Sequence, residues 1–318
     1  MKYESFEPSG SFFMLNENVT LGHGDCLELM KHIPDGSVDL ILTDPPYGTV
    51  KGAALDGWKS QTTEWDNVLD FEVMWYEINR VLRPNGACLL FSQEPFTSDL
   101  IKSTHNNMPF SYRLIWLKDH FANSLIAKKA PVNYFEDVCV FFKRHDDLKL
   151  HPLRQRIKSI IDHIGKTKKQ VFAEMGHQGV CHFFRYDTDQ FSLCTEATYN
   201  ELIELYSIDK LDDFTPYAEL VEINKSYLRV FNLHDGKKYK SNILEYKKDY
   251  NGYHPTQKPI ALLEDLIKTY SNSGDMVLDF TCGSGSTGVA AKNLNRSFTG
   301  IELDEKYFEI AKNRVESI

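Results

Sequence analysis

Residues 276–288 read Met-Val-Leu-Asp-Phe-Thr-Cys-Gly-Ser-Gly-Ser-Thr-Gly. The apolar start favours a β-strand, and the glycines that follow match G-x-G-x-x-G ahead of a helical run. Such a turn brings backbone N–H groups close to a ligand at a helix start, and Glu302, at the end of the next strand, can accept hydrogen bonds from ribose hydroxyls. The pattern predicts a site for a nucleoside-containing cofactor, with tight strand–helix packing as the plainer alternative. No Gly-Lys-Ser/Thr closes the turn, which disfavours a P-loop.

This unit lies late in the chain, whereas a dinucleotide-binding enzyme usually opens with it. One more strand, at 297–302, and one more helix, at 306–315, follow it in this sequence. The rest of the sheet must therefore come from the first half, where strands and helices alternate. We expect an α/β sheet with helices on both faces and its two halves in permuted order. Strands are expected at 19–25, 37–43, 87–92, 112–117 and 137–142, and helices at 26–32, 71–82 and 260–270.

A second motif, Asp44-Pro45-Pro46-Tyr47, ends the apolar strand at 37–43. Open α/β sheets bind their ligands at this edge, beyond the carboxyl ends of the strands. The prolines stiffen the turn, so that the Asp44 carboxylate and the Pro45 carbonyl become adjacent acceptors beside the Tyr47 ring. Two acceptors and a stacking face suit a planar ring that carries an exocyclic NH2 group. A rigid turn with a capping Asp and a core Tyr is the structural alternative.

Together these motifs resemble the amino-group DNA methyltransferases of the permuted β class. Residues 44–47 resemble the family's catalytic tetrapeptide and residues 279–287 its S-adenosylmethionine loop. Residues 254–259 resemble its methionine-side motif, and residues 24–27 the segment that contacts the cofactor's adenine. The resemblance covers residues 24–142 and 251–318. One departure is Asp279-Phe280-Thr281, where the more common loop has Asp-Pro-Phe, so that Thr281 replaces the aromatic residue beside the cofactor.

The resemblance implies a Rossmann-like, S-adenosylmethionine-dependent enzyme that methylates the exocyclic amine of a base flipped out of double-stranded DNA. It implies N6 of adenine, because the Asp form of the tetrapeptide resembles adenine enzymes more often than cytosine-N4 enzymes; cytosine N4 is the nearest alternative. A homodimer and a separately acting cognate restriction endonuclease are the protein partners that it suggests. The implied catalytic residues are Asp44, Pro45, Pro46 and Tyr47, and the implied cofactor-binding residues are Asp25, Cys26, Lys258, Asp279, Thr281, Gly283, Gly285, Ser286, Thr287 and Glu302.

The segment from 151 to 250 differs in charge from the rest. Residues 143–169 carry nine basic and three acidic side chains, residues 171–224 two basic and eleven acidic ones, and residues 225–248 seven basic and two acidic ones. Basic borders around an acidic, helical insert predict a target-recognition region, because basic surfaces bind phosphates; solvated surface charge is the alternative. We therefore divide the chain into a catalytic half at 1–150, a largely helical insert at 151–250 and a cofactor-binding half at 251–318.

The composition is that of an ordinary globular protein. The 318 residues are 42% apolar and carry a formal charge of −9, which excludes a disordered chain and disfavours indiscriminate binding of polyanions. No run approaches the roughly 20 apolar residues that span a bilayer, and no basic-then-apolar leader opens the sequence. The six cysteines include no Cys-x-x-Cys pair. We therefore expect reduced thiols, no metal centre, no membrane and a cytoplasmic location in a bacterial or phage-infected bacterial cell.

Two other classes of function compete with this interpretation. A nicotinamide-dependent dehydrogenase could use the glycine-rich turn, but the late position of that turn disfavours it, and residues 44–47 would stay unexplained. A non-enzymatic DNA-binding regulator would need a damaged catalytic or cofactor motif, and neither motif is damaged.

Overall fold

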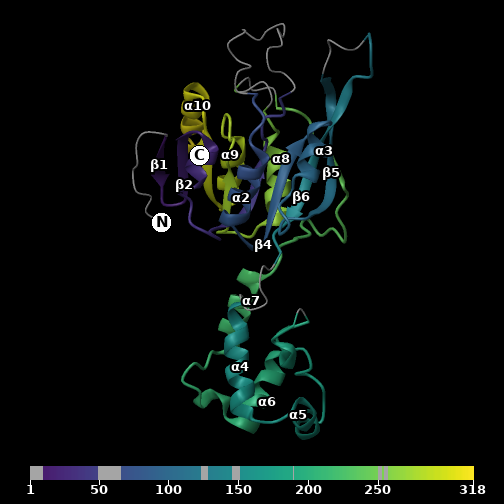
Figure 1. The fold of residues 1–318 in the computed structure, drawn as a ribbon, viewed down its shortest axis with the longest axis vertical. Helices are drawn as coiled ribbons and strands as arrows, with labels where there is room; N and C mark the ends of the chain where they lie inside the picture. Colours follow the sequence, from purple (N-terminus) through teal and green to yellow (C-terminus); the bar gives the residue numbers. More distant parts are fainter. Residues whose placement is uncertain are drawn as a thin grey trace. The chain divides into compact units, whose positions relative to one another are not determined.

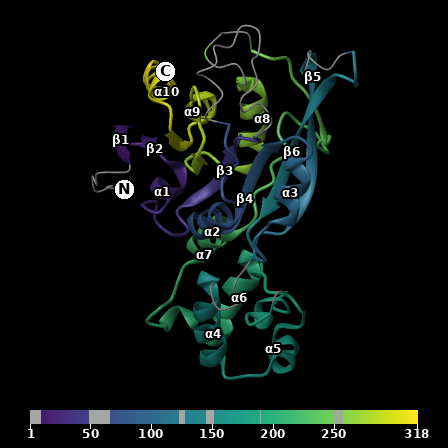
Figure 2. The same cartoon turned by 45° about the horizontal axis from the view of Figure 1, so that its top comes forward.

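The computed structural model describes residues 10–48, 66–122, 128–144, 151–188, 190–249, 253 and 257–318. It divides into two compact units, of which one comprises Met1–Arg144 with Arg229–Ile318 and the other His145–Leu228. The first unit is an α/β sheet with helices, and the second is helical (Figure 1 and Figure 2). In the described ranges, no helix is long and apolar enough to cross a membrane.

The α/β unit is built on one nine-stranded sheet in the order β1-β2-β9-β8-β3-β4-β6-β5-β7. Its five strands from β2 to β4 are parallel neighbours, whereas β1 and β6 run antiparallel to the strands beside them. The neighbours β3 and β8 join the two halves of the permuted order. The strands are β1 Gly10–Asn16, β2 Val19–Gly24, β3 Val38–Thr43, β4 Leu82–Ser92, β5 Phe110–Ala122, β6 Asn133–Phe142, β7 Ile243–Glu245, β8 Met276–Asp279 and β9 Ser297–Glu302.

Helices cover both faces of this sheet (Figure 1). On β3, Leu40 and Leu42 face the buried cluster that includes α8, α9 and α10, while Ile41 faces the one that includes α1, α2 and α3. This alternation follows from the two-residue period of a strand. The predicted α/β fold with helices on both faces is confirmed. The helices are α1 Cys26–Met30, α2 Phe71–Val81, α3 Phe96–Lys102, α8 Ile260–Tyr270, α9 Ser286–Asn293 and α10 Glu305–Glu316.

The structure extends the predicted sheet, and two of the additions lie at β1 and at the start of β4. The strand β1 was not expected, and it pairs with β2 at one edge. The strand expected at 87–92 begins at Leu82, because an irregularity keeps the intervening residues in the sheet. Within it, Asn85 adopts a φ of 61°, and its N–H donates to the backbone oxygen of Lys143 over 3.1 Å. The turn-forming residues are thus held by the end of β6.

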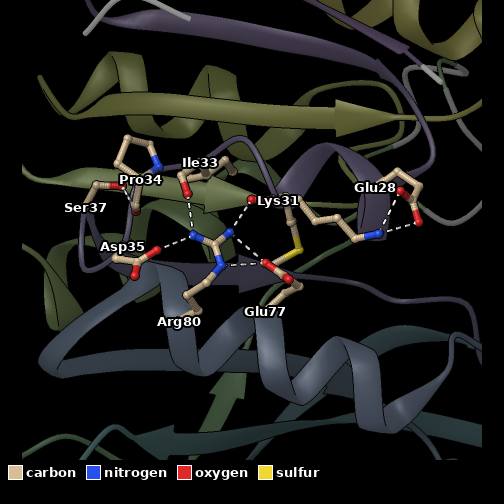
Figure 3. Close-up of polar contacts among 9 residues, drawn as sticks. Glu28, Lys31, Ile33, Pro34, Asp35, Ser37, Glu77 and Arg80 are labelled. Carbon is tan, nitrogen blue, oxygen red and sulfur yellow. Dashed lines mark hydrogen bonds and ion pairs between the residues drawn. The ribbon is translucent and has the colours of Figure 1, made fainter. Parts of the chain in front are cut away.

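An ion-pair cluster fixes α1 and the turn after it to α2 (Figure 3). The Arg80 guanidinium donates to the backbone oxygens of Met30 and Ile33 over 2.6 and 2.7 Å. It also contacts the Glu77 carboxylate at 2.6 Å and the Asp35 carboxylate at 2.6 Å. One side chain of α2 thus satisfies the carbonyls at the end of α1 and orients the turn that leads into β3.

The helical unit has a core of its own. Leu153, Ile157, Val171, Phe183 and Leu202 belong to a buried cluster that contains no residue of the sheet. A short turn joins α4 to α5, with Gly165 ending α4 in the left-handed region and Thr167 capping α5. Its helices are α4 Pro152–Ile164, α5 Lys168–Met175, the 3₁₀ turns Phe183–Arg185 and Ile208–Lys210, α6 Glu196–Tyr206 and α7 Tyr217–Tyr227.

The compact helical unit is shorter than the insert expected at 151–250. Residues from Arg229 onward belong to the α/β unit, because β7 extends the sheet by pairing with β5. Asn232 also donates to the backbone oxygen of Lys268 over 3.1 Å, next to the end of α8. The basic run at 225–248 therefore belongs mainly to the α/β unit.

Candidate active site

The Asp44 turn and the glycine-rich turn lie side by side at the carboxyl edge of the sheet. β3 and β8 are neighbouring parallel strands, so both turns leave the same edge. The Thr281 hydroxyl donates to the backbone oxygen of Asp44 over 3.1 Å, and the Thr43 hydroxyl donates to the Asp279 carboxylate over 2.7 Å. Segments that are 236 residues apart in the sequence are thereby joined into one site.

The Asp44 carboxylate accepts hydrogen bonds on both oxygens. The Tyr47 hydroxyl donates to Oδ1 over 2.6 Å, and the Lys258 ammonium donates to Oδ2. Burial raises the pKa of Asp44, although Lys258 opposes the shift. Burial and the Asp44 charge raise the pKa of Tyr47, so this hydroxyl keeps its proton and acts as a donor. The Tyr47 ring packs 5.1 Å from the Phe96 ring, centroid to centroid. The turn also contains Pro45, which is buried, and Pro46, which is partly buried.

The glycine-rich turn presents backbone toward a carboxylate. Gly283 and Gly285 have φ angles of 53° and 79°, which favour glycine. A Cβ at Gly285 would lie 2.9 Å from the Cβ of Ala311, whereas one at Gly283 would meet no atom within 4 Å. The Gly283 N–H donates to Glu302 Oε2 over 2.8 Å, and burial raises the pKa of Glu302 to about 7. The turn is therefore closed by α10 on one side and open at Gly283.

The other residues of the loop are buried and hydrogen-bonded. Burial raises the pKa of Asp279 to about 6, and the hydroxyl of Thr287 is among the donors that oppose the shift. Ser286 and Thr287 form the first turn of α9, where the Ser286 hydroxyl accepts from Arg314 over 3.2 Å. The loop is thus rigidly held from β8 into α9, and Asp279 orders its backbone by accepting from the Thr281 N–H.

One buried polar group lies beside the loop without a hydrogen-bond partner in the described part of the chain. Gln257 is buried, and its Nε2 meets no hydrogen-bond acceptor among the residues that the structure describes. Its Oε1 lies 3.5 Å from the Ser284 hydroxyl. An orphaned buried amide, an open backbone at Gly283 and the Glu302 carboxylate together fit a ligand with ribose hydroxyls and polar tail groups. The preceding residues of the methionine-side motif, 254–256, lie outside the described residues.

Asp25 and Cys26 lie at the same edge. β2 is parallel to β9, and His23 is opposite Glu302, so the end of β2 adjoins the glycine-rich turn. Asp25 caps α1 by accepting from the N–H groups of residues 27 and 28 over 2.9 and 3.1 Å. Burial raises the pKa of Cys26 to about 12, which keeps this thiol neutral. The loop after β2 therefore offers a capped helix start beside Glu302.

The sequence did not reveal Glu136 and Lys118, two charged residues close to the Asp44 turn. Lys258, which the resemblance implies on the methionine side of the cofactor, places its ammonium against Asp44 and 3.1 Å from Glu136. Lys118 donates to the other oxygen of Glu136. The signal in the sequence was one charged residue beside each of two apolar strand runs, Lys118 just after 112–117 and Glu136 just before 137–142. These two charges can be linked only when β5 and β6 are known to pair. Within the described ranges, no three His, Cys, Asp or Glu side chains gather as a metal site would require.

The fold with both turns at one edge is a Rossmann-like methyltransferase sheet in permuted order. A family profile described as DNA methylase matches residues 38–313. The chain belongs to this family, the N6/N4 DNA methylases, whose cofactor is S-adenosylmethionine. The family assignment removes the nicotinamide dehydrogenase alternative.

Two relatives illustrate the sequence similarity. The chain is 28% identical to the DNA adenine methyltransferase YhdJ of Escherichia coli over 95% of this chain and 84% of the relative. It is 27% identical to the type II methyltransferase M.HinfI of Haemophilus influenzae over 96% of this chain and 72% of the relative. Both alignments include the two halves of the sheet and the helical unit.

Two solved structures share the fold. The M1.HpyAVI–SAM complex has a TM-score of 0.53 at 22% identity and covers 93% of this chain and 98% of its own. The cytosine-N4-specific PvuII DNA methyltransferase has a TM-score of 0.52 at 15% identity and covers 94% of this chain and 86% of its own. At these identities the likeness shows the fold alone.

Proposed function

We propose that this chain transfers a methyl group from S-adenosylmethionine to the exocyclic N6 of adenine in double-stranded DNA. The observation that carries the proposal is the contact of Thr281 with the backbone of Asp44, which sets the acceptor-rich Asp44 turn beside the glycine-rich turn. The Asp-Pro-Pro-Tyr form of residues 44–47 and the adenine activity in the name of YhdJ favour adenine. Cytosine N4 is the second candidate, because the matched family comprises both N6 and N4 methylases.

The Asp44 turn supplies the hydrogen-bond acceptors for the amine. Each carboxylate oxygen can accept two hydrogen bonds, so Asp44 can bind an amino proton while Tyr47 and Lys258 stay in place. The Pro45 carbonyl would accept the second amino proton. S-adenosylmethionine, when bound, would supply a methyl group bonded to a positively charged sulfur. The lone pair of the amine nitrogen would bond to the methyl carbon as the carbon–sulfur bond breaks, and the sulfur would leave as a neutral thioether. Two acceptors orient that lone pair, and the Asp44 carboxylate then takes the proton that the methylated nitrogen loses.

The reaction requires a base that has left the helix stack. Flipping costs a few kcal/mol, and stacking on an aromatic ring returns about 1–3 kcal/mol per base. The Tyr47 ring would stack on the flipped base. Its hydroxyl donates to the Asp44 carboxylate, and the Phe96 ring packs against it. Contacts to phosphates must supply the remainder of the cost.

The glycine-rich turn and its neighbours would hold the cofactor. Glu302 would accept from the ribose hydroxyls, the backbone at Gly283 would lie against the cofactor, and Gln257 would gain a partner for its Nε2. The loop at Asp25 and Cys26 would line the adenine side. These assignments are independent of the base that is methylated.

Replacing Glu302 by glutamine is expected to weaken binding of S-adenosylmethionine about tenfold or more, because a neutral acceptor replaces a charged one. Titration calorimetry at pH 8 measures this affinity. Glu305→Gln, at an exposed position in the first turn of α10, is the matched control. An unchanged affinity in Glu302→Gln would remove Glu302 from the cofactor site.

The same variant has a pH-dependent effect on the unliganded protein. Burial raises the pKa of Glu302 from 4.5 to about 7, so the fold favours the neutral carboxyl and the wild-type protein loses stability as the pH rises between these two values. Glutamine does not ionise. The free energy of unfolding of Glu302→Gln, relative to wild type, is therefore expected to increase from pH 5 to pH 8, as urea denaturation at the two pH values would measure.

The helical unit is our candidate for DNA contact. Lys168 and Lys169 begin α5 directly after the turn from α4, and Lys169 is exposed. If both contact phosphates, the double variant Lys168→Gln/Lys169→Gln should lower the slope of log K against log salt concentration by about two. Lys225→Gln on α7, whose side chain pairs with Glu222, is the control and should leave the slope unchanged. Equal slopes for the double variant and wild type would exclude Lys168 and Lys169 as phosphate contacts.

Methylation itself is tested by mass spectrometry of nucleosides. Purified protein is incubated with S-adenosylmethionine and unmethylated DNA, and the DNA is digested. N6-methyladenine is the expected product. N4-methylcytosine would keep the mechanism and correct the base, whereas no modified base despite cofactor binding would contradict the proposed function.

A further inference from the structure

We propose that Glu136 is a positioning residue, which holds the Lys258 ammonium against the Asp44 carboxylate. The inference rests on the proposed methyl transfer at Asp44. It assigns a role in the reaction to a residue of β6, a strand that contains none of the sequence motifs.

The geometry is a chain of four alternating charges. Lys258 donates to Asp44 Oδ2, and its ammonium also lies 3.1 Å from Glu136 Oε2. The other oxygen of Glu136 accepts from Lys118. The side chains of Lys118, Lys258 and Glu136 are only 2%, 8% and 13% exposed. Two cations and two anions thus neutralise each other where water has little access.

Sheet pairing explains why these charges meet. Glu136 of β6 is opposite Trp116 of β5, and Lys118 follows two residues later on the same face. β6 lies beside β4, which lies beside β3. Because β6 runs antiparallel to β4, the start of β6, with Glu136, lies at the edge where β3 ends and Asp44 follows. Lys258 precedes α8, and its ammonium lies 4.9 Å from the centre of the Phe91 ring. Sheet, turn and helix start converge on one ammonium group.

A buried ammonium needs this arrangement to stay charged. Burial alone would lower the pKa of Lys258, but Asp44 and Glu136 outweigh burial and raise it. Glu136 is held ionised in turn, because Lys258 and Lys118 outweigh the burial that would raise its pKa. Removing either partner of a buried pair usually costs far more than the pair contributes. Lys258 is therefore a fixed charge, located by two carboxylates rather than one.

Glu136 also affects the pKa of Asp44, the base that accepts the amino proton. Its negative charge helps to raise the pKa of Asp44, while Lys258 opposes that rise. Without Glu136, Lys258 would pair with Asp44 alone, and the pKa of Asp44 would fall. Asp44 would then be a weaker base for the amino proton. Tyr47, Lys248 and Asp279 also interact electrostatically with members of this group of four charges, and Asp137 acts on Tyr47.

The test compares Glu136→Gln, Glu136→Asp and wild type in methylation of DNA. In Glu136→Gln, we expect kcat to fall by about tenfold or more, because the acceptor loses its placement, and the acidic limb of the pH profile to move to lower pH. In Glu136→Asp, the charge is kept but its reach is shorter, so kcat should fall less and the limb should stay in place. Glu245→Gln, at an exposed position in the same sheet, is the matched control.

A second measurement separates positioning from general damage. If Glu136 acts through Lys258, the substitution Glu136→Gln should reduce kcat in wild type but not further in a Lys258→Met background. Additive losses in that cycle, or a wild-type kcat and pH profile in Glu136→Gln, would overturn the inference. Should Glu136→Gln fail to fold, Glu136→Asp decides: a wild-type kcat would contradict positioning. An inactive wild-type protein would instead refute the proposed function, so the two failures are distinguishable.

Discussion

Replacing Asp44 by asparagine is expected to lower kcat for methyl transfer by about 100- to 1,000-fold, because a preorganised charged acceptor at the reacting atom is lost. Asparagine keeps the size and one carbonyl oxygen, but it cannot take the proton from the methylated amine. It also leaves Lys258 paired with Glu136 alone. Single-turnover assays with labelled S-adenosylmethionine measure the loss.

Cofactor binding should be preserved in Asp44→Asn. The glycine-rich turn contacts the backbone oxygen of Asp44 through Thr281, and this contact does not need the carboxylate. Asp99→Asn, exposed in the first turn of α3, is the matched control and should behave as wild type in both assays. Near wild-type turnover in Asp44→Asn would remove Asp44 from the mechanism, whereas a parallel loss of cofactor affinity would assign it a binding role.

Replacing Arg80 by methionine is expected to destabilise the α/β unit by about 3 kcal/mol or more, because it leaves a buried charge unpaired. The Glu77 side chain is only 5% exposed, and Arg80 is its ion-pair partner (Figure 3). The substitution also removes the donors to the backbone oxygens of Met30 and Ile33. Urea denaturation followed by circular dichroism measures the change in the free energy of unfolding.

Two variants make the interpretation specific. The double variant Arg80→Met/Glu77→Met removes both charges and should recover part of the lost stability, because no buried charge is left unpaired. Lys31→Met breaks the Lys31–Glu28 pair, whose side chains are about half exposed, and should change stability little (Figure 3). A destabilisation in Arg80→Met no larger than in Lys31→Met would show that the cluster does not hold α1 to α2.

The sheet and its order could be predicted because local patterns carry them. A short, nearly continuous apolar run marks β3, which is buried on both faces, and an apolar helical face marks α8 at 260–270. The prediction missed β1, whose alternation is interrupted and whose residues are mostly partly buried or exposed. The prediction also placed residues 229–250 with the insert. Charged side chains indicate that a segment is exposed to solvent, but they do not reveal which unit the segment packs against.

The site was partly predictable, because local sequence patterns also mark the strands beside which its residues lie. Asp44 and Glu302 each follow or end a strand that the sequence marks, and parallel pairing brings them to one edge. Glu136, Lys118 and the orphaned amide of Gln257 could not be found, because their meaning depends on partners far away in the sequence. The roles of these residues toward cofactor and base were inferred from the chemistry of the two motifs and from the family resemblance, and they stay predictions.

The pairing of β3 with β8 has a consequence for how the protein is made. A ribosome releases β3 long before β8, because more than 200 residues separate these two neighbouring strands in the sequence, as the pairing of Leu40 with Val277 shows. Until β8 and β9 have emerged, β2 lacks its neighbour β9 and β3 lacks its neighbour β8, and the open edges of both strands can pair with wrong partners. The helical unit, whose core uses residues 153–220, can complete itself earlier. Synthesis should therefore pass through a state with a folded insert and an unfinished sheet, in which aggregation competes with closure.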